Sequence, residues 1–322
     1  METIAYIINN LLLILYTICG GIDLGIGSLI LLTTLFKKDN KFLFNIFNPL
    51  WEINNVFLIF FIISFMFFFP KAIDHYSNLL IIPTFIAIFF GFLRASSFTY
   101  LHFYNKNSKV FQLMFGFSSI FMALFLFSYY AINIRNYSDS IDFLQPTLLN
   151  FATVLFVLVT ITALGSSFVY ALIKKDDFIH NGEFVKNIYI RSVIAFVLVY
   201  SLISIIIFQQ TTLANQYFFF EFILVLICLL SSIYLAQKHK VLPCVIFVLI
   251  IISIIFNLMI AKYPKISVFS DLTIYNTFTN KASFDLMMIA LGAGIIFTIP
   301  GLIVFYKMFL SDKFTNSYDD EE

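Results

Sequence analysis

The sequence predicts an all-α polytopic membrane protein in which nine transmembrane helices form a single integral membrane domain over residues 1–322. Hydrophobic residues make up 61% of the chain and charged residues only 11%, and the mean hydropathy is +0.96. Such a composition indicates that most of the chain is surrounded by lipid. The apolar residues also gather in runs of about twenty or more, the length that crosses a bilayer as a helix. No basic cluster of the kind that binds nucleic acid is present, so no nucleic-acid partner is expected.

Nine apolar runs define the expected helices in chain order. They cover residues 6–36, 51–70, 78–103, 110–132, 148–173, 188–208, 217–237, 241–261 and 283–310. The second run opens at Asn48 and Pro49, a favourable N-cap followed by a favourable first helical residue, and it stops at Pro70. The longest polar connection, 262–282, separates the eighth run from the ninth.

The basic residues predict the orientation of these spans. If the N-terminus is outside, the inner loops and the C-terminal tail hold 13 of the 19 Lys and Arg residues, and the outer loops hold 5. Arg94 lies within a span. Because cytoplasmic loops carry the excess of positive charge, the N-terminus is expected outside and the acidic tail, Asp319 to Glu322, in the cytoplasm.

A short repeat suggests how the spans are grouped. Leu-Phe-Lys-Lys-Asp (35–39) ends the first span, and Leu-Ile-Lys-Lys-Asp (172–176) ends the fifth. The spacing predicts that spans 1–4 and 5–8 are related four-helix units, with the ninth span added to them. Alternatively, each of the two segments is a signal that halts translocation, and two such signals would look alike without any repeat of the fold.

Two ionisable residues lie deep in apolar spans, where each costs about 2.5–3.5 kcal/mol on insertion scales. They are Asp23, within the glycine-rich segment 20–27, and Arg94 in the third span. Their depths differ by about 6 Å at helical rise, a gap that an extended Arg side chain closes, so the two are expected to pair. The glycines would let a neighbouring helix come close. Pairing that serves packing alone remains an alternative.

A polar cluster opens the second span. On a helix, Glu52 and Asn55 share one face, and Trp51 and Asn54 share the next. Such residues face protein or water, because lipid offers them no partner. In the alternative interpretations, Glu52 complements the helix dipole from the first turn, and Trp51 belongs to an interfacial aromatic belt.

The chain shows no set of metal ligands. Its four histidines fall in loops or at span ends, and its three cysteines lie in apolar runs without a C-x-x-C pair. Buried, inert thiols are the expected state of such cysteines. We therefore expect neither a metal site nor a catalytic residue in this chain.

Five motifs occur along the chain: GGIDLGIG (20–27), NPLWEINNVF (48–57) followed by Phe69-Pro70, Leu93-Arg94, YPKI (263–266) and LTIYN (272–276). In this order they resemble subunit II of the cytochrome bd-type quinol oxidases over essentially the whole chain. The resemblance implies nine transmembrane helices, arranged as two four-helix bundles plus one peripheral helix. It also implies a cytoplasmic C-terminus, in agreement with the loop charges.

The resemblance further implies a role in a complex. In this family two b-type haems and one d-type haem are ligated by subunit I, which also oxidises quinol. Subunit II packs against subunit I as a heterodimer in a bacterial or archaeal cytoplasmic membrane, and it contributes to proton uptake from the cytoplasm for the reduction of O2 to water. The chain alone is expected to be inactive. The quinone type, a structural quinone in this subunit and small accessory subunits stay open.

The resemblance carries over roles for Glu52, Asp23 and Arg94, and the polar cluster of the second span adds Asn55, Trp51 and Asn54. The expected proton-path residues are Glu52, Asp23 and Asn55, and the expected structural residues are Arg94, Trp51 and Asn54. Two departures are present. Gly20 stands where family members often carry a second acid, which removes one proton carrier, and Glu52 stands where many carry Asp, which keeps the chemistry and adds a methylene.

Two other functions remain as alternatives. The first is a secondary transporter with an ion or substrate site at Asp23, Glu52 and Arg94, although the spans show no matched pair of broken half-helices. The second is a purely structural assembly subunit. Haem absorbance in the purified complex, and none in the chain expressed alone, would favour the oxidase.

Overall fold

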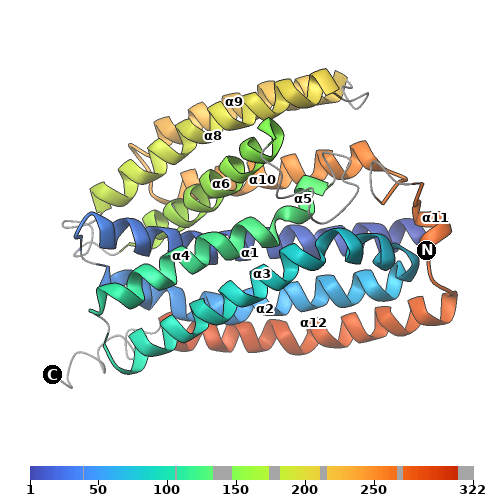
Figure 1. The fold of residues 1–322 in the computed structure, drawn as a ribbon, viewed down its shortest axis with the longest axis horizontal. Coiled ribbons are helices and arrows are strands. Elements are labelled where there is room, and N and C mark those ends of the chain that lie inside the picture. The colour runs from blue at the N-terminus through green and yellow to red at the C-terminus, as the bar shows by residue number, and fades with distance from the viewer. Residues whose placement is uncertain are drawn as a thin grey trace.

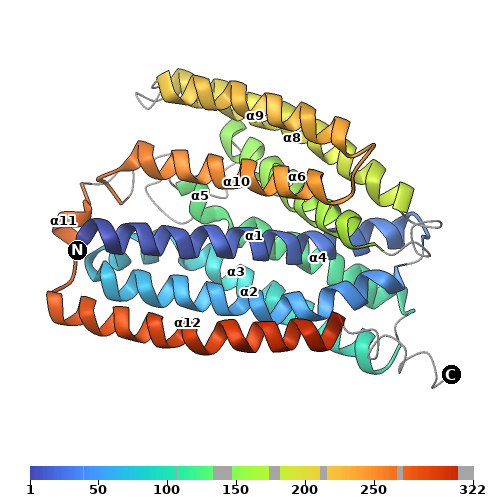
Figure 2. The same cartoon turned by 180° about the vertical axis from the view of Figure 1, so that it is seen from behind.

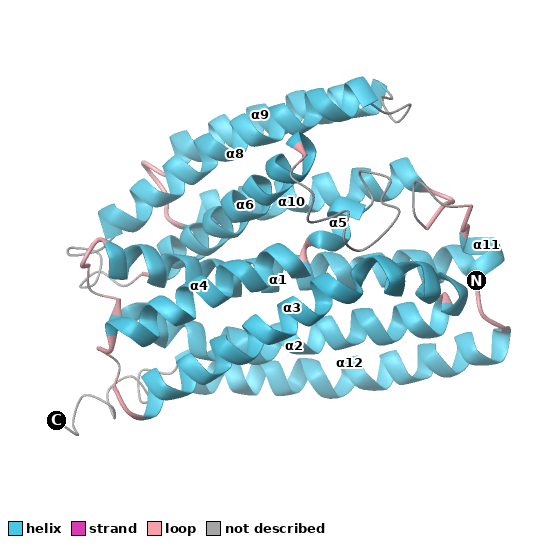
Figure 3. Ribbon diagram, viewed as in Figure 1, coloured by secondary structure: helices cyan, strands magenta, loops and turns pink. Residues whose placement is uncertain are grey.

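The computed structural model describes residues 1–38, 40–105, 107–132, 147–173, 182–210, 216–266 and 271–310. Within its helices, the side chains of residues 41, 45–54, 131–132, 206–210, 216–220, 302 and 304–310 lie outside the described part. The described residues form helices joined by loops (Figure 3), and their sole β-type pairing is an isolated bridge between Lys265 and Thr273.

The described helices account for most of the chain. In chain order they are α1 (Glu2–Leu35), α2 (Lys41–Phe68), α3 (Pro70–Phe103), α4 (Lys109–Leu126), α5 (Ser128–Ile132), α6 (Leu148–Leu172), α8 (Glu183–Gln210), α9 (Gln216–Leu235), α10 (Val241–Lys262), α11 (Ile274–Thr277) and α12 (Lys281–Leu310). Among the described side chains, seven helices are long and apolar enough to cross a membrane, and α2 and α9 contain the shorter apolar stretches Asn55–Phe68 and Glu221–Leu235. The prediction of an all-helical polytopic membrane protein is confirmed.

Helix α1 is the central element of the molecule (Figures 1 and 2). In its apolar window, 83% of the residues are buried, and it packs against α2, α4, α6 and α10. In the first group of helices, α1 packs on α2 and α4, and α4 packs on α3. In the second group, α6 packs on α8 and α10, and α10 packs on α9. Helix α12 lies along α2 at one edge of the molecule, opposite α8 and α9.

The two groups meet where α1 and α6 touch backbone to backbone. A Cβ atom on Gly25 would lie 2.0 Å from the carbonyl oxygen of Ile161, and a Cβ atom on Gly165 would lie 2.3 Å from the carbonyl carbon of Gly25. Gly27 lies equally close to Ser119 of α4. The prediction that the glycines of the first span admit a neighbouring helix is therefore confirmed.

Helix α2 begins earlier than the sequence predicts. It starts at Lys41, so Asn48 and Pro49 are interior residues of the helix, and their assignment as N-cap and first helical residue was wrong. Residues 42–44 are apolar and buried, and their burial favours helix across a proline that removes only one hydrogen bond.

The residue before α2 ties the helix to the end of the first group at which α1 ends and α4 begins. The side-chain amide of Asn40 donates to Thr34 Oγ1 (3.1 Å) and to Gln112 Oε1 (3.0 Å). Asn40 therefore joins the end of α1, the start of α2 and the first turn of α4. Likewise α3 begins at Pro70 and not at 78, because a proline is well placed in a first helical turn.

The described residues of the connection between α10 and α12, 263–266 and 271–280, form a strap across the opposite end of the molecule. The Tyr76 hydroxyl of α3 donates to the Ile266 carbonyl (3.1 Å), and the Thr279 amide donates to the Phe68 carbonyl of α2 (3.0 Å). The short helix α11 contacts α1 and α3. The strap thus fixes the ends of α1, α2 and α3 relative to α10.

The outward surfaces of the helices are apolar. Large side chains are strongly exposed on α3, α8 and α12, as the exposed fractions of Phe92 (70%), Leu198 (67%) and Phe297 (80%) show. Contiguous apolar surface of this kind is not maintained against water. These faces therefore meet membrane lipid or a membrane-embedded partner.

Candidate functional site

The structure brings Asp23 of α1 and Arg94 of α3 together. Arg94 Nη1 donates to Asp23 Oδ2 (3.0 Å), and Nη2 donates to Asp23 Oδ1 (2.8 Å). Asp23 is fully buried, and Arg94 is 3% exposed. This is the bidentate geometry in which a guanidinium holds a carboxylate most firmly.

Helix α4 completes the surroundings of the pair. Arg94 Nε donates to Ser119 Oγ (2.9 Å), and the Ser119 hydroxyl donates to the Phe115 carbonyl (2.7 Å). The guanidinium carbon lies 5.1 Å from the centre of the Phe115 ring. The close contact of Gly27 with Ser119 brings α4 near enough for these bonds. The pair therefore ties α1, α3 and α4 together in a region from which water is excluded.

Glu52 lies well inside its helix. Its backbone is eleven residues beyond Lys41, or about 16 Å along the axis at helical rise. The prediction that Glu52 lies in the first turn, where the helix first meets water, was therefore wrong, and the dipole-cap alternative loses its basis because the dipole effect falls off within one turn. The side chains of Trp51, Glu52 and Asn54 lie outside the described residues, whereas Asn55 is described and exposed.

The pairing of α1 with α2 gives the depth of Glu52. The Asn9 amide of α1 donates to Ser64 Oγ of α2 (2.8 Å). Since the two helices run antiparallel and rise equally per residue, this contact places Asp23 at the level of residue 50. The Glu52 backbone is thus about 3 Å from the level of Asp23. Two of the predicted proton-path residues, Asp23 and Glu52, therefore share one depth in the first group of helices.

A second polar region lies nearer the strap. Thr17 of α1 shares a hydrogen bond with the Tyr130 hydroxyl of α5. The neighbouring Tyr16 hydroxyl is buried without a hydrogen-bond partner among the described residues. Tyr16 and Asp23 are seven residues apart and so share a helix face. That spacing was the signal in the sequence that Tyr16 lies on the same side of α1 as the ion pair.

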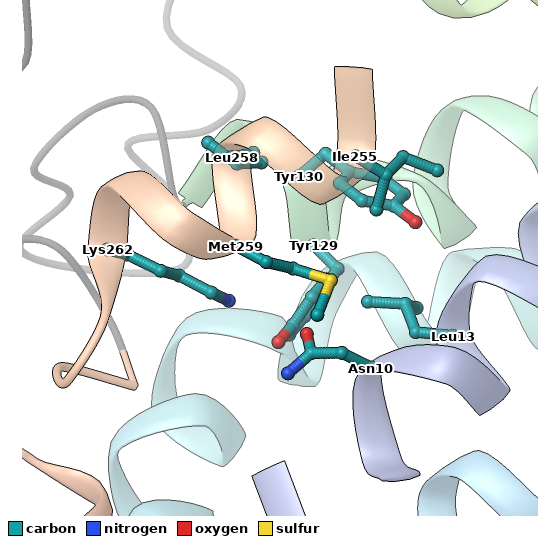
Figure 4. A pocket seen from close by; sticks show the side chains of 8 residues that line it. All are labelled: Asn10, Leu13, Tyr129, Tyr130, Ile255, Leu258, Met259 and Lys262. Carbon is teal, nitrogen blue, oxygen red and sulfur yellow. The ribbon is translucent and has the colours of Figure 1, made fainter. Parts of the chain in front are cut away.

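Lys262 is one of the five basic residues that the sequence assigns to the outer loops. In the structure it is the last residue of α10 and is buried. Its ammonium group points toward Tyr129 in a crevice between α1, α5 and α10 (Figure 4), and Nζ lies 5.7 Å from the Tyr129 ring centre. The crevice is lined by Asn10, Leu13, Tyr129, Tyr130, Ile255, Leu258, Met259 and Lys262.

The described residues contain no group of three or more His, Cys, Asp or Glu side chains that could hold a metal ion. Cys19, Cys228 and Cys244 are free thiols, each partly buried. Within the described part of the chain, the polar site therefore consists of an ion pair, amides and hydroxyls.

Comparisons with known proteins agree with this architecture. The family model described as cytochrome bd terminal oxidase subunit II matches residues 1–309. A solved structure, described as the structure of bd oxidase from Geobacillus thermodenitrificans, contains a chain that is 21% identical, with a TM-score of 0.79 over 97% of this chain and 99% of that one. At this identity the likeness shows a common fold. No curated protein matches the chain.

Proposed function

The chain belongs to the family of cytochrome bd terminal oxidase subunit II, and from this premise we propose how it serves the oxidase. It is a subunit of a cytochrome bd quinol oxidase complex, and its partner is subunit I. The proposal is that subunit I ligates the two b-type haems and the d-type haem, which pass electrons from quinol to oxygen. This chain then supplies a scaffold and part of the route by which protons from the cytoplasm reach the site of O2 reduction.

The proposed topology has nine crossings in two four-helix bundles, with α12 as the peripheral helix, the N-terminus outside and the C-terminus in the cytoplasm. Two observations support it. Helices α1 and α12 begin at the same end of the molecule and run in the same direction (Figure 1), as an odd number of crossings requires. Only 17% of the apolar window of α12 is buried, against 83% for α1, so α12 lies at the periphery of the subunit.

The proton route is proposed to run along α2 to Glu52. The observation that carries it is the depth that Glu52 shares with Asp23, where the Arg94 guanidinium already binds the second carboxylate. Glu52 is proposed to load and release the proton, because proton exchange through Asp23 would require the bidentate contact to open. Asn55 lies one helical turn beyond Glu52 and is exposed in the single chain, so it is placed to pass a proton onward through water. Trp51 and Asn54 are proposed to support this turn of the helix.

Replacing Glu52 by Gln tests the route. Gln keeps the size and hydrogen bonding of the side chain but cannot carry a proton. The Glu52→Gln complex should retain its haem spectrum and quinol binding, and its oxygen consumption should slow severalfold or more, because proton transfer by a positioned group typically contributes about 10²-fold or more. Glu52→Asp should keep much of the activity.

Asp285→Asn is the matched control, since it removes an exposed carboxylate near the start of α12 and should leave turnover unchanged. Wild-type oxygen consumption by the Glu52→Gln complex would contradict the route. A purely structural subunit, favoured by the complete pairing of Asp23 with Arg94, would then be the better assignment. The transporter alternative is set aside because the family is that of an oxidase subunit.

A further inference from the structure

Glu221 provides a second carboxyl site, in the second group of helices. In the sequence Glu221 stands near the start of an apolar run. In the structure it lies against α10, where its Oε2 accepts a hydrogen bond from the Asn257 side-chain amide. Ser253, one turn earlier on α10, also faces this carboxyl, and Tyr200 of α8 lies beside it. The site is therefore built from all three helices that meet around the start of α9.

No cation compensates this carboxyl within the described part of the chain. The ion pairs found there join Met1 to Glu2 and Asp23 to Arg94. The ammonium of Lys262, the nearest charged residue along α10, is turned toward Tyr129. Residues 211–220, whose side chains are not described, contain neither Lys nor Arg. Among the described residues, Tyr200 is thus the titratable group that faces Glu221.

The second carboxyl oxygen of Glu221 indicates which protonation state the site favours. Glu221 Oε1 is buried and has no hydrogen-bond partner among the described residues. An ionised carboxylate in this position would leave a desolvated charge without a cation, which is strongly unfavourable. A protonated carboxyl carries no net charge, and its O–H can donate to a neighbouring hydroxyl or carbonyl.

We propose that Glu221 binds an exchangeable proton and so forms a protonatable site in the second group of helices, separate from Glu52. The amide of Asn257 binds one oxygen, and the hydroxyls of Ser253 and Tyr200 offer hydrogen-bonding groups around the other. Helix α9 begins at the same end of the molecule as α1 (Figures 1 and 2). Glu221 is about 8 Å along the axis from the start of α9, so its proton exchanges with the aqueous phase at that end.

Dicyclohexylcarbodiimide applied to the assembled complex in membranes tests the proposal, because this apolar reagent reacts with a protonated carboxyl in an apolar setting. The carboxyl proton passes to a carbodiimide nitrogen and the carboxylate oxygen bonds to the central carbon. The resulting O-acylisourea rearranges to a stable N-acylurea by transfer of the acyl group from oxygen to nitrogen, and no oxidant or reductant is needed. Mass spectrometry of the peptide that contains residue 221 measures the product, and the Glu221→Gln complex provides the blank.

We expect labelling of Glu221 that falls by about tenfold per pH unit once the pH exceeds the titration midpoint, as for a single proton-binding group. Asp285 is the matched control in the same sample. It is exposed and does not lie in an apolar site, so its labelling should stay well below that of Glu221.

Three results would overturn the proposal. The first is an unlabelled Glu221 throughout the pH range in samples where other carboxyls react. The second is labelling of Glu221 no greater than that of Asp285. The third is labelling that is insensitive to pH but suppressed by Na⁺ at constant ionic strength, which would show that the site holds a metal cation. None of these results depends on whether Glu52→Gln slows oxidase turnover. The two proposals can therefore be contradicted independently of each other.

Discussion

At the scale of single residues, two carboxyl groups inside helices are bound in different ways. Asp23 shares both oxygens with Arg94, whereas Glu221 receives the amide of Asn257 and no cation among the described residues. A buried bidentate ion pair stays closed, because opening it leaves two charged groups in apolar surroundings that solvate neither of them. A carboxyl held by neutral groups can gain or lose a proton without moving its partners. In the proposed assignment, Asp23 therefore serves as a permanently paired charge and Glu221 as the group that exchanges a proton.

The Asp23–Arg94 pair predicts strong energetic coupling. Asp23→Asn or Arg94→Gln alone leaves one buried charge unpaired, at a cost of about 3–5 kcal/mol, and should sharply lower the yield of haem-containing complex. The double variant Asp23→Asn/Arg94→Gln carries neither charge and should recover part of that yield. The measurement is haem absorbance per unit of membrane protein, with Asp285→Asn as the exposed control. Losses that simply add in the double variant would show that the two residues do not depend on each other.

The sequence could predict this pair but not the site of Glu221. Asp23 and Arg94 stand out because an ionised group deep in an apolar run needs a partner, and the two depths match. Glu221 stands near the start of its helix, where water is a sufficient partner for a carboxylate. Its contact with Asn257 depends on the rotation of α9 against α10, and an apolar run without a strong periodicity does not define that rotation.

At the scale of secondary-structure elements, the contact of α1 with α6 joins the two groups of helices. Helix α1 ends at Leu35 and α6 ends at Leu172. These are the first residues of the two similar segments, 35–39 and 172–176, that form the repeat in the sequence. Their axes approach closely because glycines replace side chains on both surfaces at Gly25 and Gly165. Small residues are the usual means by which membrane helices pack, since lipid provides little hydrophobic drive for their association.

Gly25→Ala should destabilise the complex. Its new Cβ would lie 2.0 Å from a backbone oxygen of α6 and 2.8 Å from a backbone nitrogen, and neither atom can move without separating the helices. Overpacking of this kind costs about 1–3 kcal/mol or more. The midpoint of thermal unfolding of the purified complex should fall accordingly.

Gly292→Ala is the matched control, because a Cβ there meets nothing within 4 Å and alanine favours helix over glycine by about 1 kcal/mol. The Gly292→Ala complex should be at least as stable as the wild type. Equal midpoints for Gly25→Ala and the wild type would mean that α1 and α6 lie farther apart than the structure shows.

The sequence predicts which segments form helices better than it predicts where each helix begins and ends. An apolar run of twenty residues has few alternatives to a membrane helix, because its backbone groups must be bonded internally. The start of α2 depends on other forces. Asn48-Pro49 is a sound local signal for a helix start, yet residues 42–44 gain more by being buried in helical form than the proline costs. The anchoring of Asn40 by Gln112 crosses between helices and leaves no local signal in the sequence.

At the scale of the whole molecule, the family motifs cluster in one part of the fold. They occupy α1, α2, α3 and the strap between α10 and α12, whereas α6, α8 and α9 carry none of them. The first group of helices therefore carries the features by which the family was recognised, together with the ion pair and Glu52. The second group buries α6 against α1 and offers the separate carboxyl of Glu221. The proposed proton route through Glu52 therefore lies in the same group of helices as most of the family motifs.

The orientation of the molecule in the membrane gives the last prediction. Of the 19 basic residues, 13 fall on the side assigned to the cytoplasm and 5 on the other, and the excess of Lys and Arg determines which loops stay inside. Since α1 and α12 run in parallel, the chain beyond Leu310 should emerge on the side opposite to the N-terminus. Green fluorescent protein fused after Glu322 folds only in the cytoplasm and should fluoresce, and alkaline phosphatase at the same point should be inactive. Fusions after Gln210, where α8 ends at the side assigned to the outside, should give the reverse. Phosphatase activity after Glu322 with fluorescence after Gln210 would invert the topology, and protons following α2 from its first residue toward Glu52 would then come from the outside.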